Sequence, residues 1–342
     1  MLDILDFLAS AKDDIIRPLF SERQRRQLRL MGLGSIRQSQ YGMGRECPQK
    51  LYLSGRVPAE RASAYMLFGS VFAKASEAPD EALARCTDEG YYLSLFKQVR
   101  AVDPNVVFYH QGNPVDWGMV KSWALMMSTR ERLGMTFGEL VHTTQEALYA
   151  AGIRTLQREE RLSYKEGHGD HALELFGTLD QRGFFHGKPI VLDIKLYGVS
   201  SVYLETDGSI KKQSFTPLEM QFHPQLRHYE WLLWKQKREA IDFYGIVAPA
   251  NLVPYIKGPE KGKARGLPFF FSPTLGTKGR IAYEEDFKRF FSSFVASPPY
   301  RAMPTNFGTV SCPSCPYFNA CLGDVSSATQ AAALSDLSYL KD

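Results

Sequence analysis

Long hydrophobic runs are absent from this sequence. No stretch of about 18 consecutive apolar residues occurs, so a membrane-spanning helix is not expected. The first residues, MLDILDFLASAKDD, are acidic and lack the basic start and small-residue cleavage site of a secretory signal. We therefore expect an intracellular, cytoplasmic protein without a membrane partner.

Cysteine is scarce, with five residues among 342. An odd number of cysteines in a reducing compartment argues against a disulfide framework. The fold does not need one, because an apolar content of 44% allows a sizeable core.

A strong excess of charge is also lacking, since the formal net charge is only +4. The basic residues are nevertheless unevenly placed, and two short stretches are rich in them. Each stretch predicts either an ordinary solvated surface or a groove that follows a phosphate backbone. The residues are Arg23, Arg25, Arg26 and Arg29 in the first stretch, and Lys257, Lys261, Lys263 and Arg265 in the second.

Local patterns predict a mixed α/β fold, in which helices flank a sheet. Strands are predicted at 154–164, 172–185, 189–197 and 241–248, and helices at 63–77, 217–238 and 283–296. His186-Gly187-Lys188 predicts a hairpin turn between the second and third strands. The expected segments are a helical region at 1–62, a mostly helical one at 63–152, a core at 153–300, a cysteine segment at 301–323 and a tail at 324–342.

Two aspartates and a lysine lie on successive predicted strands. Asp180 ends the run LFGTLD, and Asp193 and Lys195 lie in VLDIK. Residues two apart in a strand point to the same face, and a hairpin would bring Asp180 beside them. Two carboxylates can bind Mg²⁺ or Mn²⁺, which would polarise a phosphoryl oxygen and lower the pKa of a bound water. Lys195 would orient or deprotonate that water, or offset charge on the phosphate.

A D…DxK pattern alone is common and is compatible with surface charge. Here Asp193 and Lys195 interrupt the apolar run PIVLDIKL, where burying unpaired charge is costly, and this favours a functional role. Gln225 and Tyr229 follow on the next predicted helix and share one of its faces. Their pairing predicts either simple packing or positioning of the substrate or of the lysine.

Three cysteines are closely spaced near the end of the chain, as Cys312-x2-Cys315-x5-Cys321. Cys47, far upstream, can supply a fourth thiolate. Four thiolates suit a 4Fe–4S cluster or zinc, and the distant fourth cysteine favours the iron–sulphur cluster over a compact zinc ribbon. Cys86 stands alone and is expected to pack as a small apolar residue.

Taken together, these motifs resemble the RecB-like branch of the PD-(D/E)XK nucleases. The likeness is greatest to its iron–sulphur group, which includes the AddB nuclease domain and the CRISPR-associated spacer-acquisition exonucleases. The motifs occur in family order between about residue 40 and residue 323. They are RECPQKLYL, FGSVFAKASE, GTLD, VLDIK, QLRHY and CPSCPYFNAC.

The resemblance implies a restriction-endonuclease-like core sheet and a cluster that joins the N- and C-terminal regions. It implies that Asp180 and Asp193 bind the catalytic metal, that Lys195 is the motif lysine, and that Gln225 and Tyr229 form the family's QxxxY element. The cluster ligands would be Cys47, Cys312, Cys315 and Cys321.

One position departs from the family pattern. The helix after the first cysteine usually reads Gly-x-x-x-His, with the histidine as a metal ligand, but Gly69 is followed by Ala73. Water and a backbone carbonyl could fill the gap, or Glu77, His110 or His142 could replace the histidine. In the third interpretation, the site is catalytically weakened.

The expected function is that of a metal-dependent exonuclease acting on single-stranded DNA or DNA ends in replication, recombination or repair. The alternative is a weakened, DNA-binding subunit of a larger assembly. No GxxxxGK[ST] motif is present, so a helicase or another recombination or replication protein would be a separate partner. A stand-alone nuclease of this type fits a viral protein in a bacterial host.

Overall fold

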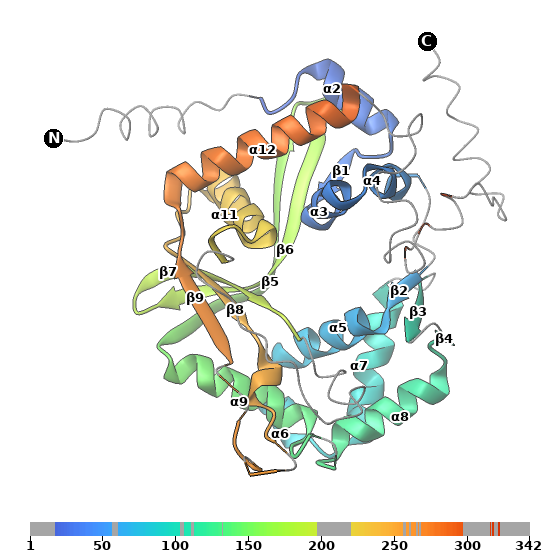
Figure 1. Cartoon of the computed structure of the whole chain (residues 1–342), viewed down its shortest axis with the longest axis vertical. Coiled ribbons are helices and arrows are strands. Elements are labelled where there is room, and N and C mark those ends of the chain that lie inside the picture. Colours follow the sequence, from blue (N-terminus) through green and yellow to red (C-terminus); the bar gives the residue numbers. More distant parts are fainter. Residues whose placement is uncertain are drawn as a thin grey trace.

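The chain forms a twisted sheet with helices packed at both ends of its longest strands (Figure 1). The computed structural model describes residues 18–56, 61–102, 106–110, 113–131, 133–196, 220–255, 258–259, 261–264, 266, 268–296, 315, 317 and 321. The α-helices within these ranges are α2 (Glu22–Leu30), α3 (Gln38–Glu46), α4 (Pro48–Ser54), α5 (Ala64–Ser76), α6 (Pro79–Ala84), α7 (Glu89–Val102), α8 (Trp117–Ser128), α9 (Phe137–Ala150), α11 (Pro224–Lys237) and α12 (Gly276–Ala296).

The main sheet is mixed. It contains β1 (Ser35–Arg37), β5 (Ile153–Glu166), β6 (Leu173–Phe185), β7 (Lys188–Ile194), β8 (Phe243–Val247) and β9 (Phe269–Pro273). Its order is β1-β6-β7-β8-β9, with β5 paired to β6. β5, β6 and β7 run antiparallel to one another, whereas β7 and β8 are parallel and have α11 between them in the chain. A second, small sheet joins β2 (Arg61–Ser63), β3 (Val107–His110) and β4 (Asn113–Pro114).

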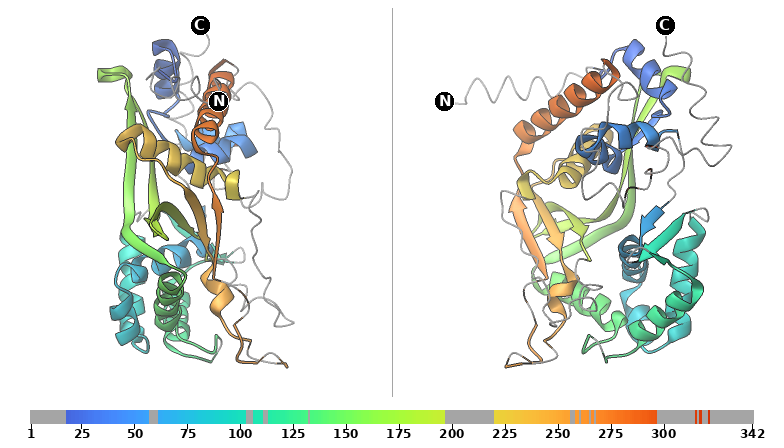
Figure 2. Two further views of the ribbon diagram at one scale, coloured as in Figure 1. Left: turned by 90° about the vertical axis from the view of Figure 1, so that its left-hand side faces the viewer. Right: turned by 45° about the vertical axis from the view of Figure 1, so that its right-hand side comes forward.

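Helices gather at both ends of the long β5–β6 hairpin (Figure 2). Among the described residues there are two large hydrophobic cores, and a third, smaller cluster includes Ile153 and Phe185, where β5 begins and β6 ends. The first joins α2, α3, α4, α11 and α12 to the sheet, and its large members include Trp231 and Phe287, whose rings stack 6.1 Å apart. The second lies mainly within α5–α9, where Phe72 and Phe137 meet edge to face. The central part of β6 and β7 therefore lies between two separately packed groups of helices.

Helix α11 is placed closely against the sheet. It begins with Pro224, which suits the first turn of a helix, and ends at Lys237, where the capping residue Arg238 has a left-handed φ of 56°. A Cβ added to Gly177 of β6 would lie 2.8 Å from Tyr229 Cε1, so only glycine allows this approach. The GTLD motif thus sets the distance between α11 and β6 as well as carrying Asp180.

Most predicted elements are present with adjusted ends. The mixed α/β class is confirmed, and the three central strands form β5, β6 and β7. The predicted hairpin turn is also present, with His186 at φ 48° and Gly187 at φ 80° between the paired Phe185 and Lys188. The final helix is longer than predicted and begins at Gly276.

The short strands were not predicted. β1 lies in the region expected to be helical, and β3 and β4 interrupt the mostly helical segment. β9 lies between the last predicted strand and the last predicted helix, where no element was predicted. The helix predicted at 217–238 corresponds to α11, which begins at Pro224. Residues 220 and 221 are also helical, and a turn at 222 separates them from α11. Residues 217–219 and the predicted tail lie outside the described residues.

Candidate active site

Strand register brings the two aspartates together. Gln181 of β6 pairs with Leu192 of β7, so the next residues along the two antiparallel strands, Asp180 and Asp193, are opposite each other. The backbone amide of Ile194 donates a hydrogen bond to Asp180 Oδ2 at 2.7 Å. The two carboxylates predicted as metal ligands are therefore neighbours on adjacent strands.

Lys195 connects this pair to α11. Its Nζ lies 2.6 Å from Asp193 Oδ2 and donates a hydrogen bond to Gln225 Oε1 at 2.8 Å. Gln225 Nε2 in turn donates to the hydroxyl of Tyr229 at 2.7 Å. The structure thus brings Asp180, Asp193, Lys195, Gln225 and Tyr229 into one connected group, in which the helix holds the lysine.

Asp193 is the most enclosed member of the group. Its side chain is 0% exposed, and its Oδ1 has no hydrogen-bond partner among the described residues. Burial, followed by the charge of Asp193, raises the pKa of Asp180 to about 8. Burial and then the charge of Asp180 raise the pKa of Tyr229. Two carboxylates in such surroundings suit a divalent cation, which would compensate both charges.

The described residues contain no group of three histidine, cysteine, aspartate or glutamate side chains arranged to hold a metal ion. Mg²⁺ is commonly bound by one or two carboxylates and several waters, so the Asp180–Asp193 pair fits such an ion. The unpartnered Asp193 Oδ1 is the atom that a cation would most directly satisfy.

Sequence reasoning missed two residues beside the site. His223 precedes α11, and its pKa is lowered by burial, raised by the charge of Asp193 and lowered by that of Lys195. Glu159 of β5 has a φ of 49°, uncommon for a non-glycine residue, and its charge also raises the pKa of Asp180. Neither residue belongs to a motif, and their proximity depends on strand register and on where α11 starts.

Position 73 lies beside Glu159. Ala73, Glu77 and Glu159 line a pocket of about 370 Å³, to which α5 contributes one side. The other residues considered as replacements lie elsewhere: His142 contacts Asp80 and Glu146 at 3.5–3.6 Å. His110 packs edge to face on a tryptophan ring of α8.

The cysteine prediction falls partly outside the described residues. Cys312 lies outside them, whereas Cys47 joins α3 to α4 and is half-buried. Cys315 and Cys321 pack against the first core, which also contains residues of α4. Cys86 is half-buried, and its Cβ lies close to the backbone of α9 at a glycine, as expected for a packing residue.

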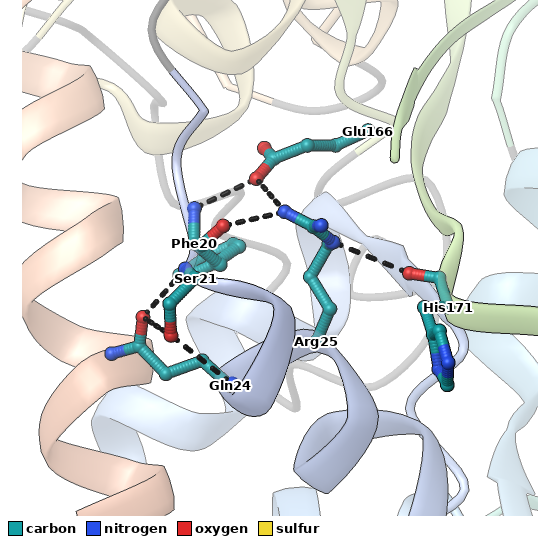
Figure 3. Close-up of polar contacts among 6 residues, drawn as sticks. All are labelled: Phe20, Ser21, Gln24, Arg25, Glu166 and His171. Atoms are coloured by element: carbon teal, nitrogen blue, oxygen red, sulfur yellow. Dashed lines mark hydrogen bonds and ion pairs between the residues drawn. The ribbon is translucent and has the colours of Figure 1, made fainter. Parts of the chain in front are cut away.

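The first basic stretch is partly structural (Figure 3). Arg25 donates to the Phe20 carbonyl at 2.6 Å and to Glu166 Oε1 at 3.4 Å, and its Nε donates to the His171 carbonyl. Glu166 also accepts from the backbone amide of Phe20. Arg29 donates to a carbonyl of the β5–β6 connection. Arg23 and Arg26 are exposed, so they are the residues of this stretch that remain suited to phosphate contacts.

The second basic stretch is described only in part. Lys261 and Lys263 are exposed, whereas positions 257 and 265 lie outside the described residues.

Among the helices that the structure describes, none is long and apolar enough to cross a membrane. Comparison with models of known protein families gives no match, and comparison with curated protein sequences gives none either.

Proposed function

We propose that this chain is a metal-dependent DNA nuclease of the RecB-like PD-(D/E)XK type, acting on single-stranded DNA or DNA ends. The observation that supports this most strongly is the buried Asp193, which is opposite Asp180, is paired with Lys195 and has one unpartnered oxygen. Burying such a carboxylate costs stability unless a ligand compensates it. A divalent cation bound by both aspartates would do so.

Each residue of the group has a role in phosphodiester hydrolysis. Mg²⁺ or Mn²⁺, when bound, would polarise a phosphoryl oxygen and lower the pKa of a water. Lys195, held by Gln225, is placed to orient the attacking water or to offset charge on the phosphate. The water loses a proton as its oxygen bonds to phosphorus, the bond from phosphorus to one sugar oxygen breaks, and that oxygen takes up a proton and leaves as a hydroxyl.

The proposal includes a 4Fe–4S cluster held by Cys47, Cys312, Cys315 and Cys321. Its support is the cysteine spacing and the packing of Cys315 and Cys321 against the core that also contains α4. The cluster would link the N- and C-terminal regions, and zinc is the competing metal. A helicase or another replication or recombination protein would be a separate partner.

Cleavage of linear and covalently closed circular single-stranded DNA in Mn²⁺ tests the proposed activity. We expect the linear substrate to be degraded and the circle to persist, because an exonuclease needs an end. Cleavage of both would indicate an endonuclease, and cleavage of neither would refute nuclease activity. Asp193→Asn serves as the inactive control.

A weakened, DNA-binding subunit is the second candidate, and Ala73 is the observation that favours it. The alanine lines the pocket beside Glu159 without supplying a metal ligand. Binding of single-stranded DNA without cleavage in either metal would support this alternative. Metal-dependent cleavage would exclude it.

A further inference from the structure

Glu159 extends the two aspartates into a row of three carboxylates. Its neighbours Arg158 and Glu160 pair with Gln181 and Leu179, on either side of Asp180, so Glu159 is opposite Asp180 on β5. Asp180 is in turn opposite Asp193 on β7. Like charges at directly opposed strand positions destabilise a sheet, so the row needs a compensating positive charge.

An independent observation also indicates a cation. Asp193, at the inner end of the row, is 0% exposed and retains an oxygen without a hydrogen-bond partner among the described residues. Lys195 supplies one positive charge to Asp193. The charge of Lys74, which lines the same pocket as Glu159, also acts on that carboxylate. Two ammonium groups still leave the three carboxylates, when all are ionised, with a net negative charge, which matches a divalent cation.

Glu159 also links the row to position 73. Both side chains line the pocket beside α5, together with Glu77. The Glu77 carboxylate already forms an ion pair with Lys74 Nζ at 2.6 Å, so it has a positively charged partner. Glu159 is exposed and its long side chain has several rotatable bonds, so its carboxylate can reorient without disturbing the core.

We propose that Glu159 is the third carboxylate of the divalent-metal site. It supplies the metal ligand that Ala73 cannot supply. This inference rests on the proposed nuclease function. The three acids do not form a ready-made metal group in the structure. Metal binding therefore requires the Glu159 side chain to turn from the α5 pocket towards Asp180.

The test is calorimetric titration of the full chain with Mn²⁺, without DNA. Glu159→Gln keeps the shape of the side chain and removes its charge, and we expect its Mn²⁺ affinity to fall by at least about tenfold. Glu285→Gln, an exposed substitution on α12, is the matched control and should bind as the unsubstituted chain does.

The outcomes separate this inference from the proposed function. If Asp193→Asn loses Mn²⁺ binding but Glu159→Gln does not, the third-carboxylate inference is overturned and the nuclease proposal stands. If neither substitution changes Mn²⁺ binding, both the third-carboxylate inference and the nuclease proposal fail. A loss of Mn²⁺ affinity with Glu77→Gln but not with Glu159→Gln would also overturn the inference. Circular dichroism of each variant confirms that it is folded.

Discussion

Lys195 Nζ donates a hydrogen bond to Gln225 Oε1 at 2.8 Å, so strand β7 and helix α11 are joined at the lysine of the candidate site. Tyr229, one turn further along α11, accepts from Gln225 and fixes the amide. Because the lysine is held by two elements, its ammonium has a defined position relative to Asp193. This arrangement makes Gln225 a positioning residue in the proposed reaction.

Gln225→Ala should therefore lower kcat for cleavage of single-stranded DNA by about 10- to 100-fold, since supporting residues of this kind have effects of that size. KM should change little, because Gln225 is assigned no contact with DNA. Tyr229→Phe, which removes only the hydroxyl, should have a smaller effect in the same direction. Steady-state kinetics in Mn²⁺ measure both, and an increase in KM with unchanged kcat would contradict the assigned role.

Gly177→Ala should destabilise the fold by about 1–3 kcal/mol, the usual cost of inserting an extra carbon into a packed core. The new Cβ would lie 2.8 Å from Tyr229 Cε1. Gly69→Ala on α5 is the matched control, because its Cβ would meet nothing within 4 Å. In a helix this control should be neutral or slightly stabilising. Urea unfolding distinguishes the two, and equal effects would refute close packing at Gly177.

The central motifs could be predicted because their signals are local. The alternating pattern of β6 and the His186-Gly187 turn define the hairpin, and the hairpin alone implies that Asp180 is near Asp193. The short strands β1, β3, β4 and β9 could not be predicted, since so few residues carry little periodicity.

The positions of Glu159 and His223 beside the aspartates could not be predicted for a different reason. The position of Glu159 opposite Asp180 depends on the register of β5 against β6, which shifts between Thr155 and Gln157. A shift of one residue would have turned Glu159 to the other face. His223 comes near the aspartates only because α11 starts immediately after it.

His228 should make the free energy of unfolding depend on pH. Nε2 donates to the Phe176 carbonyl, which can only accept, and in the neutral ring Nδ1 accepts from the Tyr283 hydroxyl at 2.8 Å. Burial lowers the pKa of His228 from 6.5 to about 4. Protonation therefore favours the unfolded chain, and stability is lost as the pH falls from about 6.5 to about 4, by an amount on the order of 3 kcal/mol.

Urea unfolding of the unsubstituted chain and of His228→Gln at pH 7.5 and pH 4.5 measures this contribution. Other carboxylates titrate in both proteins, so the difference between their pH dependences isolates the histidine. A smaller loss of stability in His228→Gln is expected. Equal losses in the two proteins would show that His228 does not contribute.

Arg25→Ala should destabilise the protein by about 3–5 kcal/mol, because it leaves the Glu166 carboxylate buried without its ion-pair partner. Arg26→Ala, one residue along and exposed, should change stability by less than about 0.5 kcal/mol. If the stretch contacts phosphate, Arg26→Ala should instead weaken DNA binding and reduce its salt dependence. Unchanged DNA binding would identify the exposed arginines as ordinary surface.

Cys312→Ala should remove iron and the brown colour of anaerobically purified protein and should reduce soluble yield. Closing so long a loop restricts the unfolded chain by roughly 5–6 kcal/mol in the chain-entropy account, and that contribution would be lost. Cys86→Ala is the matched control and should retain its iron. A colourless, stable and fully active Cys312→Ala protein would contradict the proposed cluster.

In the proposed function, Asp180, Asp193 and Lys195 form a metal-dependent site that cuts DNA. The most direct test is the cleavage rate of end-labelled single-stranded DNA in Mn²⁺ or Mg²⁺ for the unsubstituted chain, Lys195→Ala and Lys188→Ala. Lys188 lies exposed at the start of β7, the strand that Lys195 follows, and should tolerate the change. We predict metal-dependent degradation that falls on the order of 100-fold in Lys195→Ala alone. Cleavage that is equal in all three proteins, or independent of metal, would contradict the claim.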